Sequence, residues 1–171
     1  IRSLLRQVLP PRVHAGLKRA LGLPATRLHP DWQVLSVLAP SFDDEHIVID
    51  VGAHTGWFFH CWLDWCPSAR IVAFEPTAES FLKATELYGA DPRVRLFQLG
   101  IGSQTGELAF NILADSQVSN SFLAPIPEAW ASIEYNTGAI TQRLVPVTTL
   151  DRFCAERQIP GAYLLKIDVQ G

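Results

Sequence analysis

The sequence contains no methionine and only three cysteines, and charged residues make up only 18% of its 171 residues. Hydrophobic residues make up 48%, a share typical of a folded globular protein and not of a disordered one. The formal net charge is −3, so the chain lacks a general basic surface and nucleic acid is not an expected partner. No run approaches the roughly 18 consecutive apolar residues of a membrane-spanning helix.

The three cysteines, Cys61, Cys66 and Cys154, are odd in number and lack the CxxC spacing of a zinc site. Neither a disulfide framework nor a metal centre is therefore expected. The simplest interpretation is that each is a small buried hydrophobic side chain. Cysteines of this kind favour a reducing compartment, so we expect a cytoplasmic protein.

The ends of the chain differ from its middle. Because no methionine is present and residues 166–171 resemble a strand followed by a turn, we interpret the chain as part of a longer protein. Residues 1–24 alternate basic and apolar positions, which predicts short amphipathic helices. Such helices adsorb weakly to anionic lipid surfaces, although packing helices with solvated arginines show the same pattern. We expect residues 1–45 to form a helical extension and residues 46–171 to form part of the main domain.

From residue 46 onward, short apolar runs alternate with amphipathic segments. Strands are expected at 47–51, 69–74, 94–99, 106–112 and 163–169, the last in the core, with helices at 57–65, 77–88 and from 150 onward. Residues 144–147 are expected to form an edge strand because they contain Pro146. This alternation predicts an α/β fold with a Rossmann-like, doubly wound sheet. The carboxyl-terminal strands that complete such a sheet are expected to be missing.

Candidate ligand-binding residues follow the predicted strands. They are the loop 52–56 after the first strand, Glu75 after the second, residues 100–102 after the third, and Asp168 after the last. Ligands of doubly wound sheets bind at this edge. Glu75 lies 19 residues beyond Gly56, about the separation at which a carboxylate binds ribose hydroxyls. Because the loop reads Gly-Ala-His-Thr-Gly and not GxGxxG, an NAD-dependent enzyme is disfavoured and a nucleoside with a small carboxylate is favoured.

Five motifs, in order, resemble those of the FkbM family of S-adenosylmethionine-dependent methyltransferases. They are Val48–Gly56, Ala73–Pro76, Leu99–Gly102, Val147–Asp151 and Leu164–Gly171. The resemblance covers residues 46–171. It implies the class I methyltransferase fold and S-adenosylmethionine as the cofactor.

The resemblance also implies a role for most of the strand-end residues. The methionine end of the cofactor would be wrapped by the loop residues Gly52, Ala53, His54, Thr55 and Gly56. Glu75 would hold the ribose, while Ile101 and Gly102 would border the adenine. Asp50 would orient the loop backbone or face the amino group of the cofactor. We expect a backbone donor to reach at least one Asp50 oxygen, because an unpaired buried charge is costly.

Asp168 is the candidate catalytic residue, since it follows the strand that meets the transferred methyl in this fold. It either positions the cofactor or acceptor, which we favour, or acts as a general base. An ordinary Asp, with a pKa of about 3.9, is a weak base at neutral pH unless burial raises that pKa. His54 is the alternative base.

The expected function is methyl transfer from S-adenosylmethionine to a hydroxyl of a sugar or secondary metabolite, with the hydroxyl preference taken from the resemblance. The acceptor would be a small molecule or a glycan. Its pocket is expected to involve the irregular residues 114–142, where Ser119, Asn120 and Ser121 offer hydrogen-bonding groups. The alternative is a non-catalytic nucleoside-binding or scaffolding module with the same fold.

Overall fold

The computed structural model describes residues 35, 37, 39, 46–113, 120–123, 140–161 and 164–169. The first half of this region contains β1 (Ile47–Val51), α4 (Trp57–Trp65), β2 (Arg70–Phe74), α5 (Ala78–Tyr88) and β3 (Val94–Phe97). The second half contains β4 (Gly100–Ile101), β5 (Gly106–Leu113), β6 (Ile140–Thr148), α7 (Leu150–Glu156) and β7 (Leu164–Ile167). The helices predicted in residues 1–24 lie outside the described residues.

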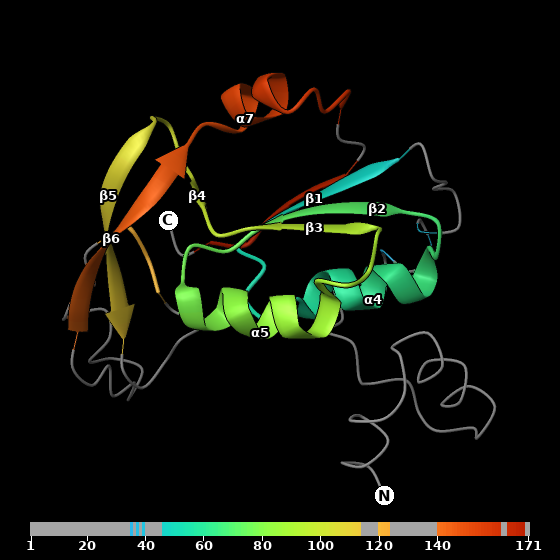
Figure 1. Cartoon of the computed structure of the whole chain (residues 1–171), viewed down its shortest axis with the longest axis horizontal. Helices are drawn as coiled ribbons and strands as arrows, with labels where there is room; N and C mark the ends of the chain where they lie inside the picture. Colours follow the sequence, from blue (N-terminus) through green and yellow to red (C-terminus); the bar gives the residue numbers. More distant parts are fainter. Residues whose placement is uncertain are drawn as a thin grey trace, which may run out of the picture.

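The main sheet contains four parallel strands in the order β3-β2-β1-β7. In Figure 1, α4 and α5 cover one face of this sheet and α7 covers the other. Every residue of β1 is buried, as its β-branched sequence predicts for an inner strand of a parallel sheet. The predicted Rossmann-like, doubly wound α/β fold is therefore confirmed.

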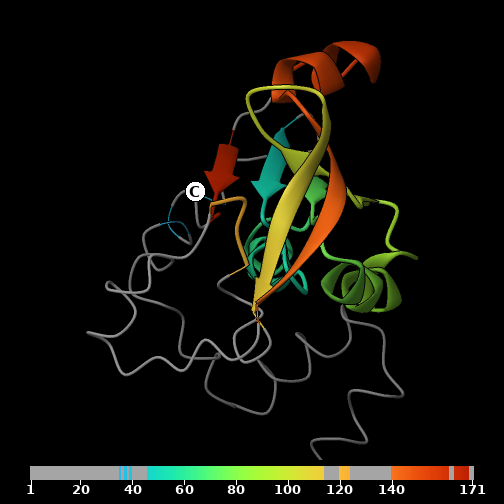
Figure 2. The ribbon, with the colours of Figure 1, turned by 90° about the vertical axis from the view of Figure 1, so that its left-hand side faces the viewer.

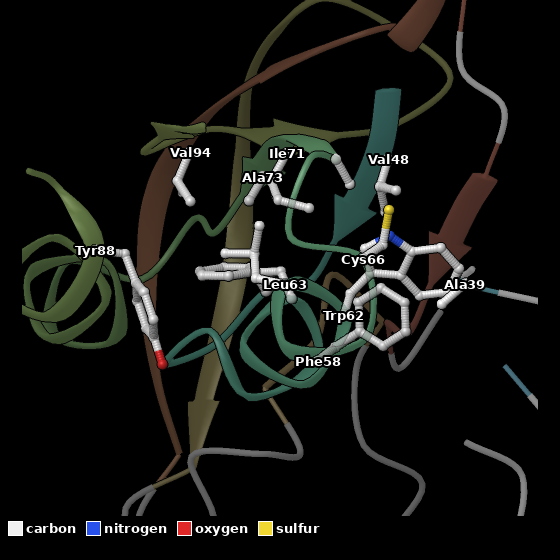
Figure 3. Close-up of a cluster of buried hydrophobic side chains, with 13 residues drawn as sticks. Ala39, Val48, Phe58, Trp62, Leu63, Cys66, Ile71, Ala73, Tyr88 and Val94 are labelled. Carbon is white, nitrogen blue, oxygen red and sulfur yellow. The ribbon is translucent and has the colours of Figure 1, made fainter. Parts of the chain in front are cut away.

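The two faces of the sheet have separate cores because successive strand residues point to opposite sides. On the α4 face, Phe58 and Trp62 pack against Val48 and Ile71 (Figure 3). On the α7 face, the buried side chains are Ile47, Ile49, Val51, Val72, Phe74 and Phe153. Strand β1, which leads into the loop at 52–56, is therefore held by packing on both faces of the sheet.

The position of β7 differs from the expected core strand at 163–169. Within the described residues β7 is an edge strand, and Leu165 and Ile167 are exposed. These two residues pair with Ile49 and Val51 and so lie on the α7 face. Phe153 of α7 packs over β1 and β2, so among the described residues this helix does not cover that face of β7.

A second sheet has the order β4-β6-β5, and β5 runs antiparallel to β6. This sheet lies beyond the carboxyl ends of the parallel strands (Figures 1 and 2). The prediction that residues 144–147 form an edge strand is wrong, because β6 is the central strand of this sheet. Proline has no backbone N–H to donate to a neighbouring strand. Strand β4 pairs with β6 only at Val147 and Thr148, so the pairing of these two strands does not depend on Pro146.

Helices α7 and α5 each begin directly after a threonine. Thr149 caps α7, where its hydroxyl accepts a hydrogen bond of 3.2 Å from the backbone N–H of Arg152. Thr77 precedes α5 and Gly89 closes it. Within the described part of the chain, no helix combines the length and the apolar character needed to span a bilayer.

Candidate functional site

The ends of β1, β2 and β7 meet at the start of the glycine loop. The backbone N–H groups of Gly52 and Ala53 both donate to the carbonyl of Phe74, at 3.0 and 2.9 Å. The N–H of Asp168 donates to the carbonyl of Val51 at 3.1 Å. The parallel topology therefore brings the predicted loop and Asp168 to one edge of the sheet, as expected.

Glu75 holds this loop in place from the end of β2. Its side chain is buried, with 7% of the residue exposed. One carboxylate oxygen accepts from the His54 N–H at 2.8 Å, and the other accepts from the N–H of Thr77 at 2.9 Å and from the Thr77 hydroxyl. A carboxylate has about four acceptor sites, and three are used, so Glu75 retains capacity for a ligand hydroxyl. The sequence did not reveal that Glu75 also anchors the loop.

The loop itself needs left-handed backbone at three positions, with φ of 77° at Gly52, 50° at His54 and 85° at Gly56. A Cβ at Gly56 would lie 2.3 Å from the ring of Phe59. The N–H of Gly56 donates to the Ala53 carbonyl at 2.8 Å. Four of the five loop N–H groups therefore bond within the protein. These four hold the loop and are not available to a cofactor carboxylate.

Asp50 is fully buried in β1, and its partner is a lysine that the sequence analysis missed. The register pairs Asp50 with Lys166 of β7, and the Lys166 Nζ lies 2.8 Å from Asp50 Oδ1. Within the described residues, Asp50 Oδ2 has no hydrogen-bond partner. Among the described residues, no backbone N–H donates to an Asp50 carboxylate oxygen, contrary to our expectation. Strand β1 lies between β2 and β7, and the hydrogen bonds that join these three strands use the backbone groups of β1. A lysine within an apolar strand was the signal that could have revealed this pair.

The environment of Asp50 raises the pKa of its carboxyl from 3.8 to about 6. Desolvation by burial is the largest cause. The ammonium of Lys166 lowers the pKa and offsets part of that effect, while the charges of Asp168 and Glu75 raise it further. The cost of burying this carboxylate is thus only partly compensated by its ion pair.

The remaining predicted residues lie in different surroundings. The side chain of Asp168 is 65% exposed, with Oδ2 3.7 Å from the Lys166 Nζ, so its carboxylate is accessible to a ligand. Ile101 belongs to β4 and packs against the core on the α7 face. The N–H of Gly102 donates to the Thr148 carbonyl at 3.0 Å. The described contacts of Ile101 and Gly102 are thus with the second sheet and the α7 side, and their adenine-binding role stays a prediction.

A cavity of about 300 Å³ lies near Glu75, and Pro76, the next residue in the chain, is part of its lining. It lies between the first turn of α5 and the second sheet, and its polar lining includes Thr77, Gln98, Asn120 and Arg143. Of the three residues named for acceptor binding, Asn120 lines this cavity, Ser121 is buried and its N–H donates to the Asn111 carbonyl, and Ser119 lies outside the described residues. Arg143 reaches the cavity through the pairing of β6 with β5, which no local sequence signal reveals.

The family model of the Methyltransferase FkbM domain matches residues 50–171, which include all the strand-end residues above. The chain belongs to the FkbM methyltransferase family. This match confirms the predicted S-adenosylmethionine-dependent methyltransferase domain and its class of cofactor.

Two kinds of relative extend this comparison. The 2-O-methyltransferase NoeI of Sinorhizobium fredii (strain NBRC 101917 / NGR234) is 25% identical over 158 residues, which cover 86% of this chain. The chain spans 61% of the length of that protein. Among solved structures, a fibrillarin/Nop5p complex matches with 16% identity and a TM-score of 0.32, covering 59% of this chain and 66% of that one. An S-adenosylmethionine-dependent methyltransferase from Geobacter sulfurreducens in complex with S-adenosyl-L-homocysteine matches with 12% identity and a TM-score of 0.35, covering 77% and 65%.

The residues of this FkbM domain fit the chemistry of S-adenosylmethionine. Asp50 Oδ2 and His54 Nε2 are buried polar atoms without a hydrogen-bond partner among the described residues. Both belong to the segment that enters and forms the glycine loop, where a cofactor with an ammonium group and hydroxyl groups would supply donors. Glu75 would hold the ribose with its remaining acceptor capacity.

Proposed function

We propose that the full-length protein transfers a methyl group from S-adenosylmethionine to a hydroxyl of a sugar or a secondary metabolite, in the cytoplasm. The observation that carries this proposal is the convergence of Glu75, the glycine loop and Asp168 at one edge of the sheet. The name of the relative, a 2-O-methyltransferase, supports a hydroxyl acceptor. When bound, the cofactor supplies a methyl group activated by a sulfonium.

Each element of this site has a proposed task. The loop 52–56 borders the methionine end, Glu75 accepts from the ribose hydroxyls, and residues 101–102 border the adenine. Asp50 Oδ2 accepts from the amino group of the cofactor. Asp168, with its exposed carboxylate, positions the acceptor hydroxyl. Methyl transfer depends chiefly on proximity and alignment, so these positioning contacts are the protein's main contribution.

Calorimetric titration of the full-length protein with S-adenosyl-L-homocysteine tests the cofactor assignment, and intact-mass detection of methylated sugars or other hydroxyl compounds tests the reaction. We expect binding and transfer. Absence of S-adenosyl-L-homocysteine binding would contradict the whole proposal. Binding without transfer to any acceptor would instead favour the non-catalytic nucleoside-binding module.

Glu75→Gln replaces one carboxylate oxygen with an amide group of similar shape. We expect the Kd for S-adenosyl-L-homocysteine to rise about tenfold, because roughly one charge-assisted hydrogen bond is lost. Titration with adenosine separates the two tasks of Glu75: an equal loss for adenosine indicates the ribose contact, whereas a smaller loss indicates loop anchoring. Glu156→Gln, an exposed position on α7, is the matched control. An unchanged Kd in Glu75→Gln would contradict the assignment.

We place the part of the acceptor beyond the hydroxyl that Asp168 positions in the cavity beside α5, where Gln98, Asn120 and Arg143 present polar groups. Arg143→Ala is expected to raise the KM for the acceptor about fivefold, the effect of a partly solvated hydrogen bond of ~1 kcal/mol. The Kd for S-adenosyl-L-homocysteine should stay unchanged. Arg152→Ala on α7 controls for the loss of an exposed arginine. If the Kd for S-adenosyl-L-homocysteine rose by the same factor, the cavity would belong to the cofactor.

A further inference from the structure

The side chain of Lys166 connects β7 to the glycine loop by a hydrogen bond. Its side chain is 16% exposed, and lysine is rarely buried to this extent unless it is paired. Asp50 is its cross-strand neighbour, with 2.8 Å between the Nζ and Oδ1. This contact alone would explain why a lysine is tolerated in the strand.

The Lys166 ammonium makes two further contacts, a hydrogen bond and a longer ion pair. It donates to the carbonyl of Gly52 at 2.9 Å, and it lies 3.7 Å from Asp168 Oδ2. The ammonium thus donates one hydrogen bond to the loop and forms ion pairs with the carboxylates of Asp50 and Asp168. The Nζ also lies 5.6 Å from the ring centroid of Phe58 on α4. Lys166 therefore links β1, the glycine loop, the end of β7 and the helix that follows the loop.

We infer that Lys166 is a positioning residue of the methyl-transfer site, which fixes the glycine loop and the Asp168 carboxylate relative to each other. The inference rests on the proposed function and deepens it. Neutralising Asp50 requires only one of the three contacts. The other two act on the residues proposed to border the cofactor and to position the acceptor, so their loss misaligns the site without removing any group that touches a ligand.

A single Lys166 variant would leave Asp50 buried without a counter-charge and would therefore affect folding. The test instead compares Asp50→Asn with the double variant Asp50→Asn, Lys166→Met in the full-length protein. In this background no buried carboxylate remains at position 50, so Lys166 is no longer required to neutralise one. Because Asp50 is also assigned to the cofactor's amino group, both variants are compared by kcat at saturating S-adenosylmethionine, so that a shared loss of cofactor affinity does not enter the comparison. Methionine keeps an unbranched side chain of similar length but lacks the ammonium.

We expect kcat of the double variant to be at least tenfold lower than that of Asp50→Asn. Urea unfolding of both variants, at the temperature of the assay, checks that both are folded. The acceptor KM should change much less, because the residues that line the cavity are unaltered. Equal kcat values would overturn the inference and would show that Lys166 only neutralises Asp50. An inactive wild-type protein would contradict the proposed function itself, which keeps the two failures distinct.

Discussion

Replacing Gly52 with alanine is expected to destabilise the protein by roughly 2–5 kcal/mol, the sum of a backbone cost and an overpacking cost. Gly52 has a φ of 77°, a conformation that side chains rarely adopt. An added Cβ would lie 2.3 Å from the backbone oxygen of Asp168. That oxygen cannot move away freely, since the N–H of Asp168 is bonded to Val51 in the neighbouring strand.

A matched glycine separates the two costs. Gly106 has a φ of 152°, but a Cβ there would meet nothing within 4 Å. Gly106→Ala should therefore show only a backbone cost, about 1–3 kcal/mol for a conformation that is essentially confined to glycine. Urea unfolding of both variants measures the difference, provided that the m-values agree. Equal destabilisation would mean that the segment after β7 yields to the added methyl group, and the contact between the loop and Asp168 would not be rigid.

The order of strands and helices could be predicted because its signals are local. The apolar run before Gly52 and the aromatic helix after Gly56 each depend on neighbouring residues, and α4 occupies the predicted range Trp57–Trp65. The environment of a strand depends on distant residues instead. Pro146 indicated an edge, yet β6 is the central strand of its sheet, because β4 pairs with it immediately after the proline, at Val147 and Thr148.

The candidate site divides in the same way. Parallel strands place their carboxyl ends together, so the meeting of the glycine loop, Glu75 and Asp168 follows from the topology alone. Lys166 and Gly52 are 114 residues apart, and their contact depends on which strand is next to β1 and in which register. The loop sequence also did not reveal that its N–H groups bond to Phe74 and Glu75, because glycine spacing indicates backbone freedom and not hydrogen-bond partners.

Asp50→Asn is expected to change how the stability of the protein depends on pH. The pKa of Asp50 is raised to about 6 in the folded protein from 3.8. Between these values the folded state holds a proton that the unfolded state has lost, so stability falls as pH rises. The free energy of unfolding of the wild type, relative to Asp50→Asn, should therefore fall by about 3 kcal/mol over the whole titration, and about 2 kcal/mol of this fall should occur between pH 4 and 6. Above about pH 7 the difference should be constant.

Urea unfolding at a series of pH values measures this difference, and Asp64→Asn, an exposed position on α4, controls for the loss of one carboxylate. The charged groups that act on Asp50 are Lys166, Asp168 and Glu75, and all three remain in the variant. A difference that stayed constant from pH 4 to 6 would mean that the Lys166 ammonium fully offsets the cost of burial. In that case the ion pair, and not the desolvation of Asp50, would determine the charge at the entrance to the glycine loop.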